Sequence, residues 1–186
     1  CGTDSEEIPV SLEGNSDSFR MKLSFLPNGN CVILPNINGR GYGFFKITEG
    51  ESSGLWSVLR SSEDEVLKGS LLITLYENLR WKTISPQGFR EEMLAYLPNE
   101  SNSLLFSMAL SYLGDCQRIF PSDSCPLEEA LWKIVTTNPV SQHRLQAFRL
   151  YRSIADSEEA VQRLYTLWQE RKAPKDCTLS ESDYIG

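Results

Sequence analysis

Apolar and polar residues alternate along the first part of the chain, and the period then changes to that of amphipathic helices. In residues 19–26 every second side chain is apolar, which is typical of a strand with one buried face. Turn-forming residues at 27–30 predict a tight connection to the next strand. Further strands are predicted by short apolar runs at residues 8–12, 31–34 and 42–47. We therefore expect a small antiparallel β-sandwich-like unit in residues 1–50.

From about residue 52 onward, apolar residues recur with helical spacing. A Ser-x-x-Glu capping box that begins at Ser62 predicts a helix over residues 62–79. A Ser-Pro dipeptide predicts a second helix over residues 85–97, because proline fits the first helical position. Asn99 is predicted to cap a third helix, which buries Leu104 and ends at Gly114.

Three more helices are predicted in the second half of the chain. They begin at Pro126, at Asn138 and after Asp156, and the last of them runs to about Arg171. Helical spacing predicts an inward-facing apolar side in this last helix. The residues expected on that side are Val161, Leu164, Tyr165 and Trp168.

The connections between these helices are short, so neighbouring helices must be antiparallel. The expected fold class is α+β by segregation, with the β unit followed by an α-solenoid-like array of antiparallel helical hairpins in residues 51–186. No sequence repeat at a fixed period is visible. A further capping box formed by Thr178 and Glu181 starts a helix with little chain behind it. We expect the helical domain to be truncated at its C-terminus, and a frayed natural terminus is the alternative.

Composition and charge exclude two classes of partner. The chain has 18 Lys and Arg residues against 25 Asp and Glu, a net charge of −7. Nucleic-acid binding is not expected, because phosphate contacts need clustered positive charge. No apolar run approaches the roughly 18 residues that span a bilayer, so no transmembrane segment is expected.

The sequence offers little catalytic chemistry. With one histidine and no Cys-x-x-Cys pair, a zinc site is not expected, and we predict no catalytic, cofactor-binding or metal-binding residue. His143 is predicted to be a surface or boundary side chain. The glycines of residues 38–43 suit a turn, since no helix follows that could hold a phosphate. Cys116 and Cys125 either form a disulfide across a turn or remain separate thiols.

A family resemblance is carried by three stretches. Residues 36–45 (NINGRGYGFF), 67–78 (LKGSLLITLYEN) and 94–100 (LAYLPNE) resemble the C-terminal region of bacterial aminopeptidase N-like zinc metallopeptidases. In that family a β-sandwich and a helical domain follow the catalytic domain. The zinc-binding His-Glu-x-x-His motif and the Gly-x-Met-Glu-Asn substrate motif are absent here. Residues 179–184 also resemble the start of a later helix in the helical domain of that family.

The resemblance implies a non-catalytic C-terminal fragment that walls and caps the active site and limits the access of peptides. Its partner would be the catalytic domain of the same polypeptide, and peptide substrates would be met indirectly. Zinc is implied for the parent's catalytic domain, and no cofactor for this chain. The implied location is the bacterial periplasm or cell envelope, with the cytoplasm left open.

Two other hypotheses remain open at this stage. Cys1, followed by Gly2 and a polar tether, looks like the start of a mature bacterial lipoprotein, although a domain boundary would give the same beginning. The chain would then be a stand-alone lipid-anchored module that binds peptides or proteins. The third hypothesis is a small hydrolase that uses an unrecognised site around His143.

Overall fold

The computed structural model describes residues 32–36, 43–174, 177, 179–181 and 183, and these belong to one compact unit spanning 32–186. The described residues form seven α-helices and one short 3-10 helix, and none of them lies in a strand. The expected α+β class with a small antiparallel β-sandwich-like unit in residues 1–50 is therefore wrong, since the part of the chain that the structure describes is helical. The predicted strands at 8–12 and 19–26 lie outside the described residues.

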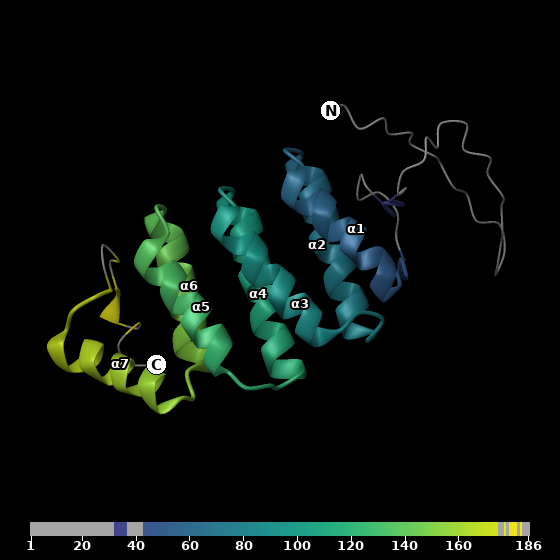
Figure 1. Cartoon of the computed structure of the whole chain (residues 1–186). Coiled ribbons are helices and arrows are strands. Elements are labelled where there is room, and N and C mark those ends of the chain that lie inside the picture. The colour runs from purple at the N-terminus through teal and green to yellow at the C-terminus, as the bar shows by residue number, and fades with distance from the viewer. Residues whose placement is uncertain (1–31, 37–42, 175–176, 178, 182, 184–186) are drawn as a thin grey trace, which may run out of the picture. The chain divides into compact units, whose positions relative to one another are not determined.

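The helices follow one another with short connections (Figure 1). In chain order they are α1 (Glu49–Ser61), α2 (Glu65–Arg80), α3 (Pro86–Tyr96), η1 (Leu97–Asn99), α4 (Ser103–Ile119), α5 (Cys125–Thr137), α6 (Ser141–Ile154) and α7 (Glu158–Glu170). Helix α1 was not predicted. Helix α4 continues five residues past Gly114, the glycine expected to end it. None of the described helices combines the length and apolarity needed to cross a bilayer.

The predicted strand at 42–47 fails because a side chain takes the place of a partner strand. Asn78 of α2 is fully buried. Its Oδ1 accepts a hydrogen bond from the Ile47 backbone N–H at 2.9 Å, and its Nδ2 donates to the Phe45 carbonyl at 2.8 Å. One carboxamide thus satisfies the donor and the acceptor that a ladder would otherwise pair. Ile47 consequently packs into the helical core.

Short polar residues cap five of the described helices through their side chains, but not always the residues expected, and α5 and α6 have no side-chain cap. The observed caps of α2, α4 and α7 are Asp64, Asn102 and Ser157, where Ser62, Asn99 and Asp156 were predicted. Each pair lies within three residues, and all these residue types cap helices well. The position at which a helix meets its neighbours decides between them, and the local sequence does not contain that information.

The array has a structural repeat that the sequence conceals. The three successive hairpins are α1–α2, α3–α4 and α5–α6. Their second helices begin at Glu65, Ser103 and Ser141, a spacing of 38 residues. Positions 38 residues apart are buried in all three helices: Leu71, Ala109 and Ala147; Leu72, Leu110 and Phe148; Leu75, Leu113 and Tyr151. Because the side chains at matched positions differ in size, the repeat is a repeat of packing rather than of residue identity.

The helices form two layers around one core. α2, α4 and α6 lie side by side, and α1, α3 and α5 each pack on the second helix of their own hairpin (Figure 1). The core consists mainly of leucine and aromatic side chains contributed by both layers. α4 and α6 make the main contact between the first two hairpins and the third.

Candidate functional site

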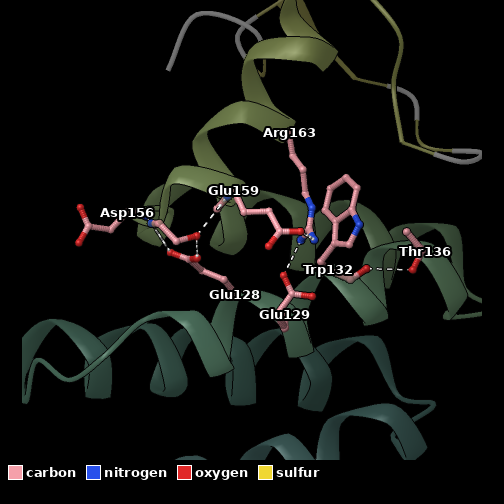
Figure 2. Close-up of polar contacts among 9 residues, drawn as sticks. Glu128, Glu129, Trp132, Thr136, Asp156, Glu159 and Arg163 are labelled. Atoms are coloured by element: carbon pink, nitrogen blue, oxygen red, sulfur yellow. Dashed lines mark hydrogen bonds and ion pairs between the residues drawn. The ribbon is translucent and has the colours of Figure 1, made fainter.

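A groove of about 650 Å³ lies between α5 and α7. The side chains that line this α5–α7 groove are Trp132, Glu158, Glu159, Gln162, Arg163, Thr166 and Leu167. Figure 2 shows Trp132 and Glu129 projecting from α5 toward Arg163 of α7. The lining contains carboxylates, one aromatic ring and one aliphatic side chain, but no histidine or cysteine. This composition suits binding rather than nucleophilic catalysis.

A buried carboxylate fixes the start of α7 against α5. Glu128, in the first turn of α5, is 1% exposed. It accepts hydrogen bonds from the Asp156 N–H at 2.7 Å, from the Ser157 N–H at 3.2 Å and from the Ser157 hydroxyl (Figure 2). Burial raises the pKa of Glu128, but these hydrogen bonds outweigh it and hold the pKa below the usual value. The charged carboxylate therefore caps the positive end of α7.

Arg163 forms the centre of the α5–α7 groove. Its Nη1 lies 2.6 Å from Oε1 of Glu129, and its Nη2 lies 2.5 Å from Oε1 of Glu159. The guanidinium also lies over the Trp132 ring, 5.5 Å from its centroid. The hydrogen bond to Glu129 raises the pKa of Arg163 above its usual value. Because two carboxylates already pair with this guanidinium, the groove presents an acidic rather than an anion-binding surface.

The outer face of α7 carries an apolar strip that the sequence placed inside. Val161, Tyr165 and Trp168, called the α7 stripe below, are each about half exposed. Leu164 is half-buried and packs on the core as expected. The apolar face of α7 is wider than the surface that covers it, so the expectation that the whole face points inward is wrong for these three residues. Leu104 of α4, also expected inside, is 76% exposed.

His143 was predicted to be a surface or boundary side chain, but it is fully buried. It lies in α6, which packs between α4 and α5 and therefore has two covered sides. Its ring stacks on Phe106 with centroids 4.0 Å apart, and its Nε2 shares a hydrogen bond of 3.0 Å with the Ser103 hydroxyl. Burial lowers the pKa of His143, and the Glu100 carboxylate partly offsets this.

The Ser103–His143 pair does not form a catalytic triad. A triad needs a carboxylate or amide that orients the second ring nitrogen of the histidine. Nδ1 of His143 has no hydrogen-bond partner among the described residues. The ring is also closed to solvent, so a substrate cannot reach it. The geometry gives no support to the hydrolase hypothesis.

The other sequence features form no site. Cys116 and Cys125 are both free thiols, the first buried and the second exposed, so the disulfide alternative is wrong. Within the described ranges, no three His, Cys, Asp or Glu side chains are grouped so that they could hold a metal ion. Of the glycine-rich stretch at 38–43, only Gly43 belongs to the part of the chain that the structure describes.

The sequence contained one signal of the α5–α7 groove. Glu159 and Arg163 are four residues apart, a spacing that places opposite charges side by side on a helix. The partner on the other wall, Glu129, is 34 residues from Arg163, and nothing local indicates that contact. In the sequence, Glu128 likewise looks like an ordinary acidic residue in the first turn of a helix. Its role at the start of α7 depends on tertiary packing.

Comparison with protein-family models, curated proteins and solved structures finds no match for this chain.

Proposed function

We propose that these helices are the non-catalytic helical region of a bacterial zinc aminopeptidase, which removes N-terminal residues from peptides. The observation that carries the proposal is the array of three helical hairpins packed in one register every 38 residues. Two stretches of the family resemblance belong to this array. Residues 67–78 lie in α2, and residues 94–100 run from the end of α3 to the residue after η1.

In this role the array would act as a rigid wall beside the active site and limit the access of peptides. Hairpins that repeat in one register form an extended surface whose shape is set by packing rather than by loops. The continuous layer of α2, α4 and α6 provides such a surface. The catalytic domain of the same polypeptide would be the partner, and peptides would meet the wall only on their way to that domain.

Zinc would belong to the catalytic domain, where it polarises the peptide carbonyl and activates water. The residues of this chain would contribute shape and exclusion, not ligands. The same proposal places the parent protein in the periplasm or cell envelope.

Two experiments test the proposal. The purified chain, with and without added Zn²⁺, should release no product from an amino-acid p-nitroanilide. Metal-dependent hydrolysis by this chain alone would contradict the non-catalytic role. The reading frame of the gene upstream of residue 1 should encode His-Glu-x-x-His, and a frame that encodes only a short signal peptide before Cys1 would contradict the aminopeptidase assignment.

A stand-alone lipid-anchored module that binds peptides or proteins is the second candidate. The α7 stripe favours it, because exposed apolar patches beside polar residues mark interaction sites. The acidic α5–α7 groove next to the stripe would select basic ligands. Labelling of the expressed gene product with a radioactive fatty acid separates the two candidates, since lipid attached at Cys1 supports the module and its absence supports the aminopeptidase.

A further inference from the structure

We propose that His143 makes the contact between α4 and α6 an acid-sensitive hinge, which loosens when the imidazole binds a second proton. The proposal stands on the packing of one side chain and does not depend on the aminopeptidase assignment. It concerns the junction through which the third hairpin attaches to the first two.

The site is built to hold a neutral imidazole. His143 is fully buried, and Phe106 of α4 covers one face of its ring at 4.0 Å. Nε2 is paired with the Ser103 hydroxyl at 3.0 Å, whereas Nδ1 has no partner among the described residues. In the protonated ring both nitrogens carry a hydrogen. The Nε2–H can donate to the Ser103 hydroxyl, but the Nδ1–H would have no acceptor. The positive charge of the ring would also be out of contact with solvent.

The charged groups around the ring cannot accommodate the new charge. The first turn of α4 and the last turn of α5 carry no charged side chain. Glu100, between η1 and α4, attracts a proton on His143, but it is already the partner of Lys68 of α2 at 2.7 Å. It also accepts the Asn102 N–H at 2.6 Å, so its oxygens are occupied.

The positive charge closest along the chain is directed to a backbone carbonyl. Arg144 follows His143 directly and is buried, with its Nη1 donating to the Asn138 carbonyl at 2.7 Å. In agreement with this geometry, burial lowers the pKa of His143 below its ordinary value of 6.5.

The position of His143 explains why the response would be a hinge motion rather than a general loosening. Ser103 and His143 both lie in the first turns of their helices, at one end of the α4–α6 contact. Farther along, the helices approach closely at Gly114, where an added Cβ would lie 2.8 Å from Cδ1 of Leu150. Protonation would therefore open the end that contains His143, while the packed end stays closed.

The sign of the pH dependence follows from linkage. The opened junction exposes an imidazole with an ordinary pKa near 6.5, and the closed junction holds one with a lower pKa. The open form therefore binds the proton more tightly. Above about pH 7 the opening equilibrium of the junction does not depend on the ionisation of His143. Below about pH 6.5 the opening constant rises by up to about tenfold per pH unit, until the pH reaches the pKa of the closed form.

The test combines hydrogen exchange with NMR on the full chain. His143 is the one histidine of the sequence, so its Hε1 proton gives a single titrating resonance. We expect its midpoint below about 6.5. After correction for intrinsic exchange, amides in the first two turns of α6 should exchange up to about tenfold faster at about pH 5.5 than at about pH 6.5. Amides of α1 should not change in this way.

Two variants make the result decisive. His143→Gln removes the titration and should exchange at the same corrected rate at both pH values. Ser103→Ala keeps the imidazole but removes the partner of Nε2, so its acid response should persist and begin at the same pH, which the exposed imidazole of the open form sets. If His143→Gln does not fold, the acid response of Ser103→Ala alone tests the proposal. The proposal is overturned if the wild type shows no acid response in α6, if His143→Gln retains it, or if Ser103→Ala loses it.

Discussion

Replacing Glu128 tests whether a buried carboxylate holds α7 on α5. Glu128→Ala removes the acceptor of two backbone N–H groups and of the Ser157 hydroxyl. Hydrogen bonds to a charged group contribute about 1.5–3 kcal/mol, and buried donors left without an acceptor add their own cost. We expect Glu128→Ala to lower the free energy of unfolding by about 2–4 kcal/mol. Glu128→Gln keeps one carbonyl acceptor but loses the charge at the helix N-terminus, and should cost about 1–2 kcal/mol.

Glu129→Gln is the matched control, because it removes the neighbouring carboxylate from an ion pair whose Glu129 side chain is 57% exposed. Exposed pairs contribute at most about 1 kcal/mol. Urea unfolding, followed by circular dichroism and tryptophan fluorescence, gives each free energy. The reasoning is refuted if the loss of unfolding free energy for Glu128→Ala does not exceed that for Glu129→Gln by at least about 0.5 kcal/mol.

The lowered pKa of Glu128 adds a pH signature to the same comparison. Unfolding restores the ordinary carboxyl value near 4.5, so the stabilising effect is fully present above that pH. As the pH falls through the lower pKa of the folded state, the contribution is lost. The difference in the free energy of unfolding between wild type and Glu128→Gln should therefore be constant from about pH 7 to 5 and shrink below about pH 4.5. A difference that grows on acidification would contradict this account.

Three further predictions concern the core and the surface. Asn78→Asp replaces two amide donors by a carboxylate facing backbone carbonyls, and should lower the free energy of urea unfolding by about 2–4 kcal/mol. Lys68→Met should cost about 3 kcal/mol because it leaves the buried Glu100 charge unpaired, and adding Glu100→Gln should recover part of this loss in a double-mutant cycle. Trp168→Ser, in the exposed α7 stripe, should change stability by less than about 0.5 kcal/mol and reduce the binding of a hydrophobic dye, whereas a larger loss of stability would show that the stripe is covered.

Local interactions made most of the helices predictable. Capping residues, proline at the first helical position and 3.6-residue periodicity act within a few residues, so α2 to α7 could be located from the sequence. The predicted N-caps of α2, α4 and α7 were wrong because several suitable residues precede these helices. Helix α1 was missed, although Thr48 and Glu51 form a capping box at its start, because its apolar residues are sparse.

Other features depend on contacts between distant parts of the chain. A short apolar run predicted a strand at residues 42–47, but Asn78, 31 residues away from Ile47, satisfies that backbone instead. His143 looked like a boundary residue because the sequence does not show that α6 is covered on two sides. The α5–α7 groove was not foreseen for the same reason, since its central ion pair joins two helices.

The location of the helices and the antiparallel order of neighbours follow from the sequence alone, because they depend on local hydrogen bonding and on the length of the connections. Which helix faces are covered depends on tertiary packing. The same apolar spacing is buried in α2 and half exposed in α7, because burial depends on whether another helix lies against that face. The 38-residue repeat belongs to this second kind of information, since matched positions preserve burial and not residue identity.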